Sequence, residues 1–318
     1  MASQGIVWAI IWLALNISVT IMNKAIFAFW SFPFPILMSS IHMLFSAVCS
    51  LACISYYKVE RKPMTSPRIR NLLTFSLLFC ANILVSNICL TFVNVSLMQV
   101  IRATIPGITI VLSMVMLGKT YTLEHAVAVC LVVVGVAGAT MGEMELHVIG
   151  ALGTFFGCVL SSLKSVLSKR FLGDADGDGY HSFDLLNRMA TFAFFEMLIL
   201  GFLNGEVSQL IESTDLHTPG ILIILSLNGA MAFALNFSNF MFTQGTNALT
   251  VTVAGNLKNM LTIIISVFVF RNPITFMNAV GTAVAMIGGA YYSWIEHKIR
   301  EFGKTAHTHE LTKVEARK

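Results

Sequence analysis

Long apolar blocks of about 20 residues, separated by short polar connections, make up most of the chain. A helix needs roughly 20 apolar residues to cross the hydrocarbon core of a bilayer. Strand-like alternation and amphipathic helical stripes are both scarce. The pattern therefore predicts an all-α polytopic membrane protein with ten transmembrane helices. The predicted spans are about 5–29, 33–56, 71–92, 96–117, 122–141, 147–168, 182–203, 220–243, 247–270 and 273–294.

Composition supports the membrane assignment. The 318 residues are 56% hydrophobic and 11% charged, with a mean hydropathy of +0.78, whereas soluble domains carry about 25% charged residues. The net charge is a modest +4, and most of the basic residues lie in loops and the C-terminal tail, which argues against a nucleic-acid partner. All six cysteines lie in apolar blocks without metal-site spacing. With no nucleophile–base constellation either, we expect no catalytic residue, metal or cofactor, and no enzyme.

The distribution of Lys and Arg predicts the orientation in the membrane. Connections after the second, fourth and sixth spans are basic, as is the C-terminal tail, whereas the connections after the fifth and seventh spans carry Glu and Asp. Only Arg271 lies on the opposite side. Because basic loops stay on the cytosolic side, we expect both termini to face the cytosol. The even number of spans agrees with this, since it places both termini on the same side.

Weak internal similarity suggests a repeat. At an offset of about 153 residues, Thr122, Ala126, Gly135 and their neighbours align with Thr275, Ala279 and Gly288. Only a few positions match, and most of them are small residues, so chance similarity is the alternative explanation. Two halves of five helices each would be inverted relative to one another. The predicted organisation is a first repeat over 1–144, a second repeat over 145–297 and a cytosolic polar tail over 298–318.

Four basic residues lie inside predicted spans: Lys24, Arg102, Lys164 and Lys258. Each costs about 2.5–3.5 kcal/mol at the centre of a membrane helix. Glu196 is the one acidic residue at comparable depth. Lys24 and Arg102 could extend to the membrane surface instead, and Lys164 could pair with Glu196. Otherwise the basic excess predicts a central cavity that binds an anion.

Lys258 is the least ambiguous of the four. It lies eleven residues from one end of its span and twelve from the other, about 17 Å along a helix, so its ammonium cannot easily reach either surface. Buried amides suggest a water-filled site around it, although helix–helix hydrogen bonding is an equal alternative for any single one. The candidate amides are Asn256, Asn259, Asn236, Asn23 and Asn87.

The segment DADGDGY (174–180) resembles the start of a calcium-binding loop. Its twelfth position is Leu185 rather than the Glu that supplies a bidentate ligand. We interpret the segment as a polar cytosolic connector and expect no metal.

Four segments together resemble one family. They are NKAIFAFWSFPFP (23–35), NVSLMQVIRA (94–103), KSVLSKR (164–170) and the run AGNLKN…FRNP…MNAVGTAVA (254–285). On these residues the chain is identified as a member of the drug/metabolite transporter superfamily (EamA/DMT-like), in the branch of triose-phosphate translocators and nucleotide-sugar transporters. The resemblance covers nearly the whole chain and implies ten helices in inverted halves and exchange by alternating access.

The resemblance also implies site residues. Lys24, Arg102 and Lys258 match the basic residues that hold phosphate in the triose-phosphate members. Those members follow the ninth-helix Lys with Arg, where this chain has Asn259. The positions of their helix-3 His and Thr look like Ile83 and Val85 or Ser86 here, and the position of their helix-8 Tyr corresponds to Leu235.

These departures favour a ligand larger than a sugar phosphate. A phosphate monoester favours several charge-assisted hydrogen bonds, and losing an Arg, a His and a Tyr weakens such a site. A nucleotide sugar spreads its charge over two phosphates and needs amide and hydroxyl partners. We therefore predict an antiporter that exchanges a nucleotide sugar for a nucleoside monophosphate across a Golgi or endoplasmic-reticulum membrane.

Two alternatives stay open: a sugar-phosphate/phosphate exchanger of the same fold, and a non-transporting membrane scaffold. No Arg-rich, Ser-rich transit peptide or cleavage pattern precedes the first apolar block, which argues against a plastid or mitochondrial address. Signatures of guanine selectivity are not evident, which leans toward uridine nucleotides. Small-molecule substrate and membrane lipid are the expected partners, and a homodimer is left open.

Overall fold

All secondary structure that the computed structural model describes is helical. The described residues are 2–30, 32–89, 92, 98, 101–140, 148–173, 179–212, 220–258, 276–277, 279–281, 283–292, 294–295 and 298–299. The labelled helices are α1 (Ala2–Phe29), α2 (Pro35–Tyr57), α3 (Ser66–Cys89), α5 (Ile105–Leu117), α6 (Leu123–Thr140), α7 (Val148–Leu172), α8 (Ser182–Leu203), α9 (Glu206–Glu212) and α10 (Ile221–Gly245). Further helical segments cover 248–258 and most of 279–292.

Six of the described helices, α1, α2, α3, α7, α8 and α10, are long and apolar enough to cross a membrane. Shorter apolar helices cover Ile105–Leu117, Leu123–Gly138 and Ala279–Tyr292. The predicted all-α polytopic membrane protein is thus confirmed, while the count of ten spans stays a prediction. Half of the predicted ninth span, the proposed repeat boundary at 144 and most of the tail lie outside the described residues, as does most of the DADGDGY segment.

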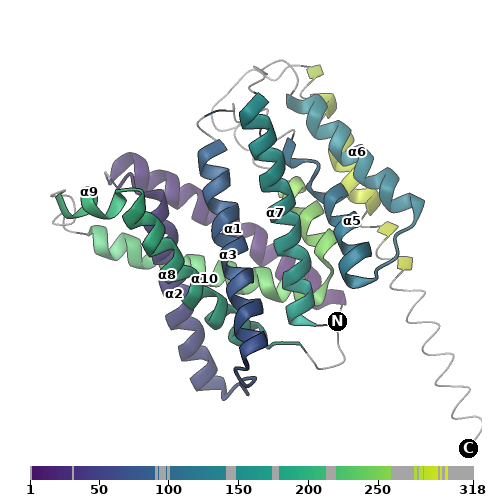
Figure 1. Cartoon of the computed structure of the whole chain (residues 1–318). Helices are drawn as coiled ribbons and strands as arrows, with labels where there is room; N and C mark the ends of the chain where they lie inside the picture. Colours follow the sequence, from purple (N-terminus) through teal and green to yellow (C-terminus); the bar gives the residue numbers. More distant parts are fainter. Residues whose placement is uncertain are drawn as a thin grey trace, which may run out of the picture.

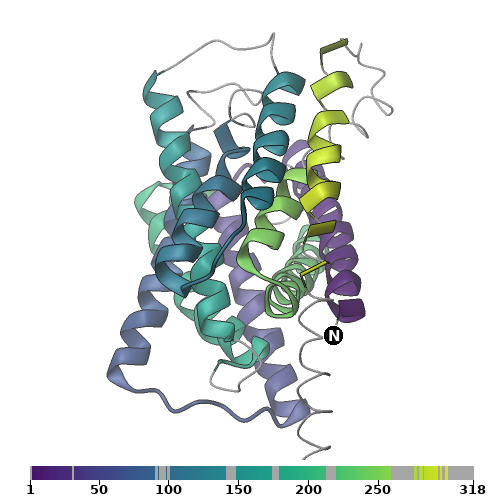
Figure 2. The same ribbon diagram turned by 90° about the vertical axis from the view of Figure 1, so that its right-hand side faces the viewer.

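The helices pack as one bundle in which α3 and α7 occupy the middle (Figure 1). On one side lie α2, α8 and α9, and on the other α5, α6 and the last helical segment. Helices distant in sequence pack most extensively: α2 with α8, α1 with α10, α2 with α10 and α3 with α7. Segment 248–258 lies beside the last helical segment (Figure 2), where Leu249 and Val253 pack with Ala128 and Tyr292.

One predicted span is interrupted. The sequence pattern predicts a continuous helix over about 96–117, but the chain forms a turn at 103–104 and α5 begins at Ile105. Pro106 explains the break, because its ring clashes with the carbonyl four residues earlier, that of Arg102, and it has no N–H to donate. Gly118 then ends α5 with a left-handed φ of 61°.

The structure adds a short helix, α9, where the sequence indicated only an acidic connection. Its first residue, Glu206, is 5% exposed and accepts hydrogen bonds from the backbone N–H groups of Ile36 (3.1 Å) and Leu37 (2.9 Å). N–H groups in the first turn of a helix have no acceptor within the helix, and the side chain of Phe34, the N-cap residue of α2, does not supply one. A carboxylate at this position also favours the positive end of the helix dipole.

Close packing of α6 against the last helical segment gives a stability prediction. A Cβ on Gly135 would lie 2.3 Å from the backbone nitrogen of Ala285, whereas one on Gly138 would lie 3.5 Å from its nearest neighbour. We expect Gly135→Ala to destabilise the protein by about 1–3 kcal/mol, since backbone must shift. Gly138→Ala, one turn away, should be neutral or stabilising. Thermal unfolding in detergent compares the two, and equal unfolding temperatures would contradict the packing.

Candidate functional site

The bundle encloses a cavity of about 280 Å³ between α1, α3, α5, α7, α10 and segment 248–258. Three basic side chains line it, Arg102, Lys164 and Lys258, and none of its described lining residues is Asp or Glu. The structure thus brings together three of the four basic residues that the sequence placed inside the membrane. This concentration of positive charge makes the cavity suited to an anion.

Helix α7 contributes one complete wall of the cavity. Its lining residues recur at the three- and four-residue spacing of a single helix face. They are small or polar in an otherwise apolar helix: Thr154, Gly157, Cys158, Ser161, Lys164, Ser165 and Ser168. The face therefore offers a row of hydroxyl groups on both sides of the Lys164 ammonium.

The other walls add neutral hydrogen-bonding groups. Amide and hydroxyl side chains come from α3 and α10 and from segment 248–258, and Trp12 of α1 lines the cavity beside them. The polar members are Asn82, Ser86, Asn239, Thr243, Thr252 and Asn256. Such groups suit the hydroxyls and heteroatoms of an uncharged part of a ligand.

Lys258 is held at the cavity by a hydrogen bond across the bundle. Its Nζ donates to Oδ1 of Asn16 on α1 at 3.1 Å. Two residues earlier, Asn256 is 4% exposed, and its Nδ2 donates to the carbonyl of Ala103 at 3.1 Å. These contacts orient two of the residues that the sequence singled out.

Arg102 lies immediately before the helix break, which frees backbone carbonyls inside the bundle. Neighbouring side chains hydrogen-bond to them. The Ile101 carbonyl accepts from Thr104 Oγ1 at 2.7 Å and from the Cys158 thiol at 3.6 Å. Irregular backbone at membrane depth is tolerated where it borders a cavity and finds such partners.

Lys164 does not pair with Glu196. The Glu196 carboxylate instead accepts hydrogen bonds from Ser76 Oγ at 2.6 Å and the Cys80 thiol at 3.0 Å. The Lys164 ammonium lies 4.7 Å from the centroid of the Phe79 ring, a cation–π distance. The carboxylate partner that the sequence left open for Lys164 is therefore engaged elsewhere.

Two of the predicted amides lie away from the cavity lining. Asn23 accepts a hydrogen bond from Asn228 Nδ2 at 2.9 Å, and Asn228 contacts His42. Asn236 donates to Ser46 Oγ at 3.1 Å. Both residues therefore hydrogen-bond between helices, which was the alternative to lining the cavity. The side chains of Lys24 and Asn87, and all of Asn259, lie outside the described residues.

The sequence analysis missed several lining residues, foremost Asn82, Asn239 and the serines of α7. The α7 face carried a usable signal, since small and polar residues recur there at helical spacing. Asn82 and Asn239 had no such signal, because nothing in the sequence around them distinguishes them from Asn23 or Asn236.

A helical membrane bundle around a basic cavity, bordered by an interrupted helix, is the arrangement found in secondary transporters of anionic solutes. The model of the Triose-phosphate Transporter family matches residues 4–293. The chain belongs to that family, and it is a membrane transporter rather than an enzyme.

Named relatives include carriers of two kinds. The chain is 32% identical to UDP-galactose transporter 1 of Arabidopsis thaliana, over 91% of this chain and 86% of the relative. It is 34% identical to the GDP-mannose transporter GONST5 of Arabidopsis thaliana, over 91% and 85%. It is also 33% identical to a "probable sugar phosphate/phosphate translocator" of Arabidopsis thaliana, over 89% and 79%.

A solved crystal structure has the same fold. It matches with a TM-score of 0.71 at 11% identity and covers 93% of this chain and 99% of that chain. At this identity the likeness extends to the fold alone.

Proposed function

We propose that the protein exchanges a nucleotide sugar for a nucleoside monophosphate across a Golgi or endoplasmic-reticulum membrane by alternating access. The observation that carries the proposal is the chemistry of the central cavity. It combines three cations with many amide and hydroxyl groups and, among its described lining residues, no carboxylate. The UDP-galactose and GDP-mannose transporters among the relatives support the same class of substrate.

Charge and polarity distinguish the proposed substrate from a small sugar phosphate. Arg102, Lys164 and Lys258 come from three different elements, so they can contact the two phosphates of a diphosphate bridge from separate sides. The neutral side chains then remain for the base and the sugar. Asn259, in place of the Arg of sugar-phosphate members, agrees with this assignment. We favour a uridine nucleotide, though the relatives carry both uridine and guanosine sugars.

Helix pairing supports the two inverted repeats, 1–144 and 145–297, on which alternating access would depend. In that scheme α1, α2 and α3 correspond to α7, α8 and α10. If each helix is replaced by its counterpart in the other half, the observed α1–α10 pair becomes α7–α3, and this pair is also observed. The same replacement turns the α2–α8 pair into itself. A transporter of this type moves its halves around a central site. With basic loops in the cytosol, both termini would face that side.

An exchange assay tests the proposal. Purified protein is reconstituted into liposomes preloaded with UMP, GMP or inorganic phosphate, and uptake of labelled UDP- and GDP-sugars is measured. We expect uptake to depend on an internal nucleoside monophosphate, with UMP the best. Exchange supported only by inorganic phosphate would overturn the proposal.

The sugar-phosphate relative makes a phosphate exchanger the second candidate. It predicts uptake of labelled triose phosphate or phosphoenolpyruvate into phosphate-loaded liposomes, and no response to UMP or GMP. A scaffold that does not transport predicts no exchange with any internal substrate. The same panel therefore separates all three functions.

A further inference from the structure

A second basic pocket lies at the end of the bundle where α7 ends and α3 begins. Its volume is about 200 Å³, and it shares no lining residue with the central cavity. No carboxylate is among its described lining residues, which are Lys62, Arg68, Asn71, Arg170, Phe171 and Tyr180. Arg170 is in the last turn of α7 and Arg68 in the first turn of α3, so the pocket lies where membrane spans meet the surface.

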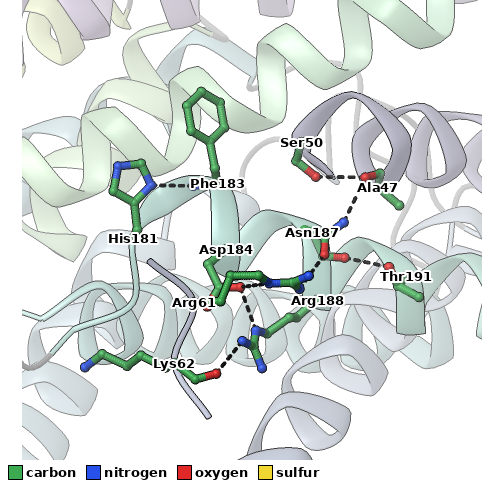
Figure 3. Close-up of polar contacts among 10 residues, drawn as sticks. All are labelled: Ala47, Ser50, Arg61, Lys62, His181, Phe183, Asp184, Asn187, Arg188 and Thr191. Carbon is green, nitrogen blue, oxygen red and sulfur yellow. Dashed lines mark hydrogen bonds and ion pairs between the residues drawn. The ribbon is translucent and has the colours of Figure 1, made fainter. Parts of the chain in front are cut away.

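A buried ionic network holds the connector between α2 and α3 in place (Figure 3). Asp184, 1% exposed, accepts hydrogen bonds from Arg61 Nε at 3.0 Å and Arg188 Nε at 2.8 Å. Arg188 also donates to the backbone carbonyl of Lys62 at 2.6 Å. The Lys62 ammonium points away from this network (Figure 3). The connector is thus anchored through the Arg61 side chain and the Lys62 backbone, and the Lys62 side chain lines the pocket.

Tyr180 forms a buried wall of the pocket. It is 7% exposed, and its backbone N–H donates to the Phe171 carbonyl at 2.7 Å. The Lys62 ammonium and the Arg188 guanidinium lie 5.9 Å and 5.8 Å from its ring centroid. Burial raises the pKa of Tyr180, and the charges of Arg188 and Arg68 oppose that rise without cancelling it. The phenol stays protonated near neutral pH and can donate a hydrogen bond.

We propose that this second pocket binds a phosphate monoester, presented by the headgroup of an anionic lipid or by a soluble ester. Lys62, Arg68 and Arg170 supply charge from two elements and the connector, and Asn71 and Tyr180 supply neutral donors. Arg68 is positioned by its hydrogen bond to the Pro63 carbonyl at 3.1 Å. Guanidinium groups match the oxygens of phosphate in a bidentate geometry. A headgroup suits the location, because basic residues next to membrane spans attract anionic lipids.

A ligand titration of the full-length protein in neutral detergent tests this site through the unfolding temperature. The probes are dioctanoyl phosphatidylinositol 4-phosphate, dioctanoyl phosphatidylinositol and inositol 1-phosphate. We expect saturable stabilisation by the first and little by the second, which has only a phosphodiester. An equal response to inositol 1-phosphate would identify a soluble ester as the ligand. Stabilisation should persist in Lys258→Ala, because the central cavity is not involved.

The double variant Arg68→Gln/Arg170→Gln should weaken this binding about tenfold or more, since two charge-assisted contacts are lost. Lys58→Gln/Arg70→Gln removes the same charge from neighbouring positions outside the pocket and should bind as the wild type does. Equal weakening by both pairs, or equal stabilisation by the two lipids, would overturn the proposal in favour of diffuse attraction. Arg170 is exposed, so Arg170→Gln alone provides the comparison if the double variant does not fold.

Discussion

Lys258→Ala is expected to abolish nucleotide-sugar exchange. Its ammonium lines the cavity and is oriented by Asn16 across the bundle. Losing one partner of a buried charged contact costs about 2–5 kcal/mol, and each 1.4 kcal/mol is a factor of about ten in affinity. Uptake at substrate concentrations below the wild-type KM should therefore fall by about 30-fold or more. The liposome exchange assay measures this loss.

The unliganded Lys258→Ala protein should remain folded. A charge inside a membrane protein is costly, so its removal should leave the unfolding temperature unchanged or higher, while the stabilisation by UMP disappears. Lys119→Ala, at an exposed position outside the cavity lining, is the matched control and should transport normally. Retained exchange together with a retained response to UMP would show that Lys258 does not contact the substrate.

Asp184→Asn is expected to cause the largest loss of stability. Asp184 and Arg188 are 1% and 6% exposed, and removing one charge of a buried pair costs about 3–5 kcal/mol. Arg188 would be left buried without its counter-charge, and one of its guanidinium nitrogens, Nη1, already lacks a described partner. Thermal unfolding should show a decrease on the order of 10 °C.

Two comparison variants sharpen this prediction. The Arg61 side chain is 40% exposed, so Arg61→Gln should cost at most about 1 kcal/mol. Asp184→Asn combined with Arg188→Met should recover part of the stability lost in Asp184→Asn, because no unpaired buried charge remains. A double variant as unstable as Asp184→Asn would contradict the ionic explanation.

Much of the fold was predictable from the sequence because a bilayer imposes a simple rule on it. A helix that crosses the hydrocarbon core satisfies its own backbone and must be apolar over about 20 residues. The helices α2, α7, α8 and α10 accordingly begin and end within a few residues of the predicted spans. The break at 103–104 was not predicted, because Pro is also tolerated inside transmembrane helices, where neighbouring groups satisfy the freed backbone.

The site was predictable in part for the same reason. Depth in an apolar segment identified Arg102, Lys164 and Lys258, since charge is rare there and needs a partner or a cavity. Amides are less costly, and the sequence could not separate those that line the cavity from those that join helices. Asn256 lines it, whereas Asn23 and Asn236 hydrogen-bond to Asn228 and Ser46.

By itself, then, the sequence determined the class of protein, the approximate spans and the presence of basic residues inside them. Tertiary structure alone decided which of those residues meet. Tertiary packing brings Lys258 to Asn16 and Arg61 to Asp184. The first pair is separated by 242 positions and the second by 123, and no local pattern carries such a relation. Local hydrophobicity specifies which segments cross the membrane, but the packing of all the helices determines which of their polar faces are in contact.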